Sequence, residues 1–275
     1  MIDRRNDLER IERALLVAGD ILRRFQPGRV EAAHKSNSDP VTEADLAVDR
    51  ALREELVRPG EAWLSEETAD DPSRLEADRV WVVDPLDGTK EFVEGLPEWC
   101  VSIGLVENGR AVAGGILNPV ADFLALGAEG LGCRLNGRTV GVSDTRELTR
   151  ATVLASRSEV RRGEWVRWDE SDVAIEAMGS VAYKLARVAC GLADATWTLV
   201  PKHEWDVAAG VALVQAAGGW VLTLDNQQPR FNQPRPWLSG LIAAAPGLEG
   251  ILRPESLLAH QNGGPEPDRK GSLLG

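Results

Sequence analysis

Acidic residues gather at three points of the sequence, each next to an apolar or small-residue segment. Glu66 and Glu67 follow AWLS, and Asp84 and Asp87 follow RVWVV. Asp206 stands near the start of EWDVAAGVALVQAAGG, a segment rich in small residues. Carboxylate oxygens are the ligands that Mg²⁺ takes in proteins, together with water and substrate phosphate. The three points therefore predict a site for Mg²⁺, provided that the fold brings them together.

The segment DPLDGT, residues 84–89, has residue types suited to a metal site and to a phosphate site. Pro85 blocks a helix, so a turn here can place both carboxylates and the carbonyl of Leu86 around one point. Gly88 and Thr89 then offer backbone N–H groups at an expected helix start, where a phosphate is stabilised. Taken alone, DxxDG is equally typical of a plain turn, and an Asp in a first helical turn equally stabilises the helix dipole.

The elements that position these motifs can be read from periodicity. Apolar residues at three- and four-residue steps predict a helix over roughly residues 1–25, and Thr42 caps a second helix that ends before Pro59. AWLSEE and RVWVVD are typical of buried strands. We expect the second strand to end at Asp84, because Pro85 cannot continue the hydrogen-bond ladder.

Later segments follow a different pattern. Over residues 100–138, apolar runs separated by Asn-Gly and Asn-Pro predict antiparallel hairpins. After about residue 150, strand-like and helix-like segments alternate, from ATVLAS through SVAYKLARVACG to WVLTL. We therefore expect an N-terminal α+β half over residues 1–150 with the metal motifs, a C-terminal α/β half over 151–255, and a flexible Gly- and Pro-rich tail over 256–275.

Composition and charge disfavour several classes of protein. The formal net charge of −12 argues against nucleic acid or an anionic membrane as a partner. The three cysteines are far apart and the three histidines show no HExxH spacing, so neither a disulfide framework nor a zinc site is expected. The N-terminus lacks a signal-peptide pattern, and the longest apolar run is split by a Gly-Gly pair. We expect a cytoplasmic protein that does not span a membrane.

The segments WLSEE, WVVDPLDGTKEF and EWDVAAGVALVQAAGG, in this order, resemble the inositol monophosphatase family of metal-dependent, lithium-sensitive phosphatases. The resemblance covers roughly residues 5–255. It implies an α/β (α+β layered) fold in which helix and sheet layers alternate as an αβαβα sandwich. It also implies a site for two or three Mg²⁺ ions, which would activate water for attack on a small phosphate ester. Members of the family often form homodimers, so a homodimer is a further expectation.

Position by position, the resemblance implies a set of site residues. The implied metal ligands are Glu66, Asp84, the carbonyl of Leu86, Asp87 and Asp206. The implied supporting residues are Asp45 and Thr89, which orient the attacking water, Glu67 beside the metal ligands, Gly88 and Thr89 at the phosphate, and Lys35 near the phosphate entrance. Without the resemblance, Asp45 reads as an exposed carboxylate in the first turn of a helix.

Several further positions bear on the substrate. Lys90-Glu91-Phe92 after DGT resembles the bisphosphate nucleotidase branch, and Leu199 stands where inositol phosphatases carry a glutamate that binds sugar hydroxyls. Ser180 and Lys184 lie where the family contacts the leaving group; Lys184 either binds a second phosphate or is an ordinary exposed helix lysine. Glu204 adds a polar contact or caps a helix. The expected activity is that of a 3'(2'),5'-bisphosphate nucleotidase, which converts 3'-phosphoadenosine 5'-phosphate to AMP and phosphate.

Other functions were weighed against this one. Inositol-1-phosphate and fructose 1,6-bisphosphate are alternative substrates, because the fold and the metals do not select among phosphomonoesters. A haloacid-dehalogenase phosphatase uses two aspartates with one residue between them, whereas DPLD has two between. A non-catalytic phosphate-binding homologue would be expected to lack Asp45, Thr89 or a metal ligand, and all of these are present.

Overall fold

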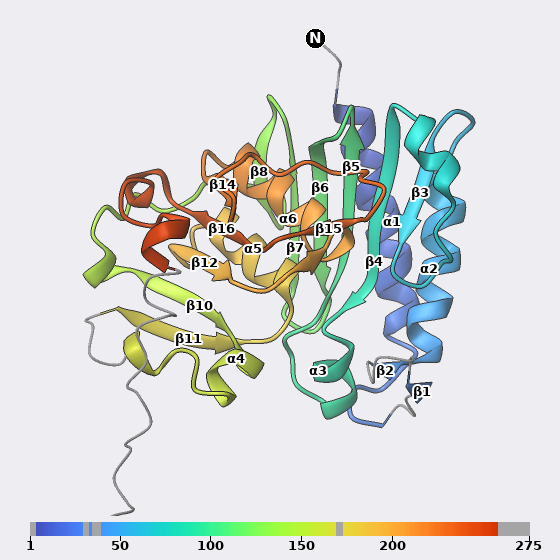
Figure 1. Cartoon of the computed structure of the whole chain (residues 1–275). Coiled ribbons are helices and arrows are strands. Elements are labelled where there is room, and N and C mark those ends of the chain that lie inside the picture. The colour runs from blue at the N-terminus through green and yellow to red at the C-terminus, as the bar shows by residue number, and fades with distance from the viewer. Residues whose placement is uncertain (1–3, 30–32, 35–39, 169–172, 258–275) are drawn as a thin grey trace, which may run out of the picture.

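The computed structural model describes residues 4–29, 33–34, 40–168 and 173–257. Helix and sheet layers alternate through the molecule: a helix pair, a seven-stranded sheet, a second helix pair, a five-stranded sheet and an outer set of short helices (Figure 1). Three hydrophobic clusters fill the spaces between these layers. The αβαβα sandwich expected from the resemblance is therefore confirmed.

The first helical layer consists of α1 (Arg5–Leu22) and α2 (Glu43–Leu56). Thr42 caps α2, as expected, because its hydroxyl accepts the N–H of Ala44 at 3.1 Å. The carboxylate of Asp45 accepts the N–H of Thr42 at 2.8 Å in return, which completes a capping box. The apolar faces of both helices pack on the seven-stranded sheet.

The seven-stranded sheet has its strands in chain order. The strands are β3 (Ala62–Ser65), β4 (Arg79–Asp87), β5 (Cys100–Glu107), β6 (Arg110–Asn118), β7 (Phe123–Ala128), β8 (Gly132–Leu135) and β9 (Arg138–Val140). The first pair is parallel, and every later pair is antiparallel. The meander predicted for residues 100–138 is confirmed. A separate two-stranded ribbon pairs β1 (Ala33–His34) with β2 (Pro40–Val41).

Strand β4 does not end at Asp84, contrary to the sequence-based expectation. Its pairing with β5 shifts in register between Asp84 and Asp87 and then resumes, with Asp87 opposite Cys100. Pro85 lacks an N–H group, so the ladder is interrupted there by an irregularity of the bulge type and is not terminated. Helix α3 (Thr89–Glu94) begins directly afterwards, with Gly88 as its N-cap residue.

The five-stranded sheet is mixed and has the order β11-β10-β12-β16-β14. Its strands are β10 (Thr152–Ser156), β11 (Ala174–Met178), β12 (Ala195–Thr198), β14 (Trp220–Thr223) and β16 (Leu241–Ala244). Sequence patterns predicted the first four. They missed β16 and a short ribbon of β13 (Lys202–His203) with β15 (Trp237–Leu238). The strands of this ribbon are two residues long, which is too short for a periodic signal, whereas β16 is as long as the predicted strands β12 and β14.

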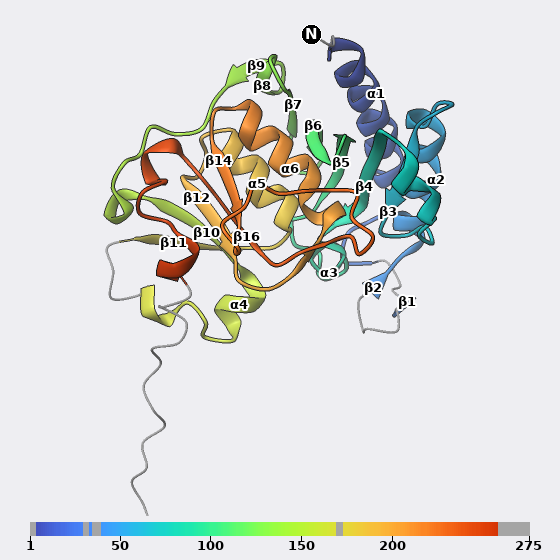
Figure 2. The same cartoon turned by 45° about the horizontal axis from the view of Figure 1, so that its top comes forward.

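Helices α5 (Val181–Ala189) and α6 (Glu204–Ala216) lie between the two sheets, as Figure 2 shows. Glycines on the seven-stranded sheet allow α6 to approach closely. A Cβ atom at Gly104 would lie 2.9 Å from the Cβ of Ala208, and one at Gly114 would lie 2.5 Å from the carbonyl oxygen of Ala209. Both distances are too short for any side chain, so these glycines determine how near the amino-terminal half of α6 comes to β5 and β6.

The outer layer covers the far face of the five-stranded sheet. It contains α4 (Arg157–Arg161). Short 3₁₀ helices in the described part of the chain lie at Pro72–Glu76, Leu148–Arg150, Val166–Trp168 and Pro246–Leu248. Leu257 is buried in this layer, so the packed fold extends at least one residue into the stretch expected to be a tail; residues 258–275 lie outside the described residues. The boundary at residue 150 stays a prediction, because α5 and α6 share one core with both sheets.

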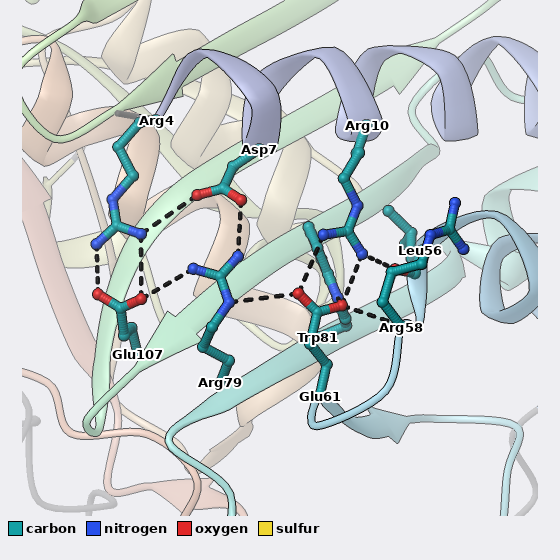
Figure 3. A network of polar contacts seen from close by, with 9 residues as sticks. All are labelled: Arg4, Asp7, Arg10, Leu56, Arg58, Glu61, Arg79, Trp81 and Glu107. Atoms are coloured by element: carbon teal, nitrogen blue, oxygen red, sulfur yellow. Dashed lines mark hydrogen bonds and ion pairs between the residues drawn. The ribbon is translucent and has the colours of Figure 1, made fainter. Parts of the chain in front are cut away.

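An ion-pair network fastens α1 to the seven-stranded sheet (Figure 3). The carboxylate of Glu61 accepts from Arg10 at 2.6 Å, from the indole N–H of Trp81 at 2.9 Å and from Arg79 at 3.3 Å. Arg79 also bonds Glu107, at 2.9 Å. Burial opposes ionisation of Glu61, but the hydrogen bonds from Arg10 and Trp81 outweigh it and lower its pKa to about 2. Among the residues that the structure describes, no helix is both long and apolar enough to cross a bilayer.

We predict that Glu61→Gln lowers the free energy of unfolding by about 3 kcal/mol near pH 7, because it removes one partner from buried cations. The pKa of Glu61 is lower in the folded chain than its ordinary value, so its contribution is complete above about pH 4.5 and is lost as the pH falls towards about 2. Urea unfolding at several pH values measures this. Glu129→Gln, at the exposed pair with Arg110, is the control and should change stability by less than about 0.5 kcal/mol. Equal losses in both variants would contradict the assignment.

Candidate active site

The centre of the site is the end of β4. Val80 and Val82 face the core that contains α5 and α6, whereas Trp81 and Val83 face the core that contains α1 and α2. Asp84 continues the first of these faces by strand alternation, and it is only 2% exposed. Its Oδ1 accepts the N–H of Leu86 at 3.0 Å, which holds the carboxylate inside the bend.

Two other chain segments bring acidic side chains to this point. Strand β3 runs parallel to β4 with Ser65 opposite Val83, so Glu66 follows at the same edge as Asp84. Asp206 lies in the first turn of α6 and accepts the N–H of His203 at 3.1 Å. Burial, and then the charges of Glu66, Asp87 and Asp206, raise the pKa of Asp84 well above its usual range. The pKa of Asp206 is raised in the same way, by burial and then by Asp87.

The set of donors fits a hard divalent cation. In the described part of the chain, no group of three or more acidic, histidine or cysteine side chains is already arranged to hold a metal ion. The carboxylates instead accept hydrogen bonds from nearby N–H and O–H groups. Their mutual repulsion, seen in the raised pKa values, is what a cation would relieve, and every donor is an oxygen. The residues therefore fit Mg²⁺, whose ligands are carboxylates and carbonyls.

Asp45 and Thr89, expected to act on the attacking water, are brought together from two helices. The hydroxyl of Thr89 lies 3.2 Å from Oδ1 of Asp45 and 2.9 Å from the carbonyl oxygen of Leu86. Asp45 is 2% exposed, so its reading as an exposed helix carboxylate is wrong. Burial raises the pKa of Asp45, although hydrogen bonds from Thr42 and Thr89 oppose the shift.

Gly88 stands between the metal ligands and α3 in a backbone conformation that other residues rarely adopt. Its φ is +95°, and a Cβ atom there would lie 2.8 Å from the carbonyl oxygen of Glu98. Only glycine fits this turn. Asp87, at the end of β4, and Thr89, at the start of the short helix α3, therefore flank this turn at Gly88.

A pocket of about 190 Å³ opens beside Asp87 and Gly88. We call it the side pocket; it is lined by Asp87, Gly88, Lys90, Glu91, Ser156, Arg157, Ser158, Arg161, Met178, Gly179, Ser180, Val181 and Lys184. Lys184 is 2% exposed, so its reading as an exposed helix lysine is wrong. Burial lowers its pKa to about 8, against the opposite effect of Glu159. Four cationic side chains thus border the place where the phosphate is expected.

Other expected site residues have protein partners elsewhere in the fold or lie outside the described residues. Glu204 is fully buried, and its carboxylate accepts the backbone N–H groups of Asn232 at 2.7 Å and Gln233 at 2.9 Å. This geometry indicates that Glu204 holds the 232–233 loop. Glu67 is half-buried behind Ser65, whose hydroxyl lies 3.4 Å from its N–H. Lys35 lies outside the described residues.

Sequence reasoning missed residues that support the site from behind. Asp49 on α2 accepts the hydroxyl of Ser65 at 2.5 Å and that of Thr68 at 2.6 Å, and so holds the loop with Glu66 and Glu67. Arg157 pairs with Glu98, whose carboxylate also lies 3.5 Å from the N–H of Gly179. These are single Ser, Thr, Asp and Arg positions without a motif. Only their places in the fold reveal the role.

Comparisons with known proteins agree with this geometry. A model of the inositol monophosphatase family matches residues 5–260. Inositol monophosphatase 3 of Solanum lycopersicum is 36% identical over 74% of this chain and 81% of its own length. A fructose-1,6-bisphosphatase/inositol-1-monophosphatase of Thermotoga maritima is 31% identical over 78% of this chain and 84% of its own length. The solved inositol monophosphatase from Anabaena superposes with a TM-score of 0.74 at 30% identity and covers 94% of this chain and 96% of its own.

The comparisons and the clustered carboxylates lead to the same conclusion. The matching family model spans nearly the whole described chain, and the relatives named above cover 74% to 94% of it. The enzymes of this family are Mg²⁺-dependent, which agrees with a site built from oxygen donors. The chain belongs to the inositol monophosphatase family and is a metal-dependent phosphoric monoester hydrolase.

Proposed function

We propose that this phosphatase removes the 3'-phosphate from 3'-phosphoadenosine 5'-phosphate. The observation that carries the proposal is the side pocket, where Lys90, Arg157, Arg161 and Lys184 border the proposed metal and phosphate site. A substrate with one phosphate has no use for this positive charge, whereas a bisphosphate places its second phosphate there. The cations also offset locally the net charge of −12, which would otherwise repel a doubly phosphorylated substrate.

A second observation supports a nucleotide over an inositol phosphate. Leu199 occupies the position at which the inositol phosphatases carry a hydroxyl-binding glutamate. It is half-buried and packs against the outer hydrophobic core. Glu204, the nearest acidic residue before Asp206, is engaged with the 232–233 backbone and is not free to replace it. A polyhydroxylated ring would therefore lose a main hydrogen-bond partner in this site.

The mechanism follows from the positions of the side chains. Mg²⁺ held by Glu66, Asp84, the Leu86 carbonyl, Asp87 and Asp206 would supply an acidified water and neutralise phosphate charge. The hydroxyl of Thr89 donates towards Asp45 at 3.2 Å and keeps lone pairs to accept a proton from the attacking water. Asp45, buried in the first turn of α2, is the group to which that proton passes. No covalent intermediate with the protein is needed.

The remaining residues bind and orient the substrate. Gly88 and Thr89 are proposed to lie against the reacting phosphate, because they directly follow the proposed metal ligand Asp87 and line the start of α3. Arg161 is exposed and Lys184 is buried, and both line the side pocket. A bound second phosphate would therefore meet one cation from the surface and one from the interior. A cytoplasmic location, inhibition by Li⁺ and a homodimer stay predictions.

Two other substrates have specific support. The relatives named inositol monophosphatase favour inositol-1-phosphate, and the Thermotoga maritima relative is named for fructose 1,6-bisphosphate as well. Fructose 1,6-bisphosphate shares the second phosphate but lacks the base. We expect phosphate release from 3'-phosphoadenosine 5'-phosphate to exceed that from either competitor by at least about tenfold in kcat/KM, which is about 1.4 kcal/mol. A colorimetric assay with Mg²⁺ measures this, and preference for inositol-1-phosphate would overturn the proposal.

The role of the second phosphate can be tested with 3'-AMP, which differs from the proposed substrate only in lacking the 5'-phosphate. Arg161→Gln should lower kcat/KM for 3'-phosphoadenosine 5'-phosphate about tenfold, because it removes one charge-assisted contact, and should leave 3'-AMP unaffected. Arg162→Gln is the matched control, since Arg162 pairs with Glu164 and does not line the side pocket. Equal losses on both substrates would mean that Arg161 does not contact the second phosphate.

Removal of one proposed metal ligand gives a third test. Asp87→Asn should lower kcat about a thousandfold or more, roughly 4 kcal/mol, because it removes a ligand charge with little change of volume. The metal-free variant should unfold at the same temperature as the wild type or higher, because one of several repelling carboxylates is gone. Asp144→Asn, at an exposed position, is the control. Wild-type turnover in Asp87→Asn would refute the ligand assignment.

A further inference from the structure

Asp87 is held differently from the other acidic residues of the site. Its Oδ2 atom accepts two short hydrogen bonds, from the hydroxyl of Ser180 at 2.6 Å and from the N–H of Ala182 at 2.6 Å. Within the described ranges of the chain, no hydrogen bond reaches its Oδ1 atom. One oxygen is therefore fixed by the protein, and the other is left for a ligand.

Ser180 is itself held in an unusual conformation. Its φ is +55°, in the left-handed region that residues with a side chain rarely adopt. Its hydroxyl accepts the N–H of Tyr183 at 3.0 Å and caps α5 while it donates to Asp87. Strained backbone of this kind persists where the surroundings over-determine it, and here the hydroxyl contacts Asp87, the N–H of Tyr183 and, at 3.4 Å, the Sγ atom of Cys100. A chain of hydrogen bonds thus runs from the first turn of α5 to the carboxylate of Asp87.

We propose that Ser180 is a positioning residue for metal binding: with the amino end of α5 it fixes the carboxylate of Asp87 so that Oδ1 is presented to Mg²⁺. The resemblance placed Ser180 in contact with substrate, but its side chain is largely buried and its hydroxyl is already engaged at both ends. The inference rests on the proposed role of Asp87 as a metal ligand. Helix α5 would then orient a metal ligand in addition to packing in the core.

Two opposing effects decide the size of the contribution. The donors draw negative charge towards Oδ2, which weakens the attraction of the carboxylate for a cation. They also remove the rotational freedom of the carboxylate before the metal binds, so less conformational entropy is lost when the ion is bound. Partners that orient a ligand in this way typically change metal affinity 10- to 100-fold when they are removed, so the second effect is the larger. Loss of the Ser180 hydroxyl should therefore weaken metal binding.

The test uses Ser180→Ala and Ser180→Gly in the full chain, with Mn²⁺ as the probe and electron paramagnetic resonance as the readout of free metal. Both variants should bind Mn²⁺ about tenfold more weakly than the wild type. Glycine adopts the φ of +55° without strain, so the comparison separates the hydroxyl from the backbone. Wild-type affinity in Ser180→Gly, with weak binding in Ser180→Ala, would assign the effect to backbone strain and overturn the proposal.

Ser143→Ala is the matched control, because the hydroxyl of Ser143 also donates to a buried aspartate, Asp194, on a different part of the fold. It should keep wild-type Mn²⁺ affinity whatever its loss of stability. In phosphate-release assays, the Ser180 variants should need about tenfold more Mg²⁺ and then reach a KM for substrate like that of the wild type. Unchanged Mn²⁺ affinity with a raised KM would show a substrate contact instead. Wild-type Mn²⁺ binding by Asp87→Asn would refute the ligand role on which the inference rests.

Discussion

Repulsion between buried carboxylates is the constraint on which the rest of this structure depends. Asp84 lies in the interior, and burial, followed by the charges of Glu66, Asp87 and Asp206, raises its pKa. Such a cluster opposes folding unless the surrounding elements are rigid and a cation is available. The same repulsion gives the site its affinity for Mg²⁺, because the ion replaces several unfavourable contacts with favourable ones.

The scaffold meets this constraint from both faces of β4. On one face, Arg79 and Trp81 join the ion-pair network that fastens α1 to the sheet, as seen in Figure 3. On the other face, glycines at Gly104 and Gly114 let α6 pack directly on the sheet and bring Asp206 close to Asp84. The strand that carries the acidic groups is thus held along its length, and its irregular end is the part left to bind ligands.

The C-terminal half contributes to chemistry as well as to packing. Helix α5 directs Ser180 and the N–H of Ala182 at Asp87, and its next turn places the buried Lys184 in the lining of the side pocket. Helix α4 adds Arg157 and Arg161 to the same pocket. The proposed metal site and the side pocket therefore share one wall. A substrate that spans both would be oriented by the rigid packing of α5 between the sheets.

The sequence by itself determined the family, most helices and strands, and the acidic segments, because these rest on local order: apolar periodicity, caps such as Thr42, and the contiguous DPLDGT. Tertiary structure alone decided what single polar residues do. Local sequence alone allows Asp45 and Lys184 equally as exposed helix residues, but both are buried. Glu204 was expected to make a polar contact or cap a helix, and its carboxylate accepts two backbone N–H groups of the 232–233 loop. Strand β4 continued past Pro85 because β5 was there to pair with Asp87. Whether a side chain is buried, and which residues it contacts, depends on segments far away in the chain. Local sequence does not encode which segments those are.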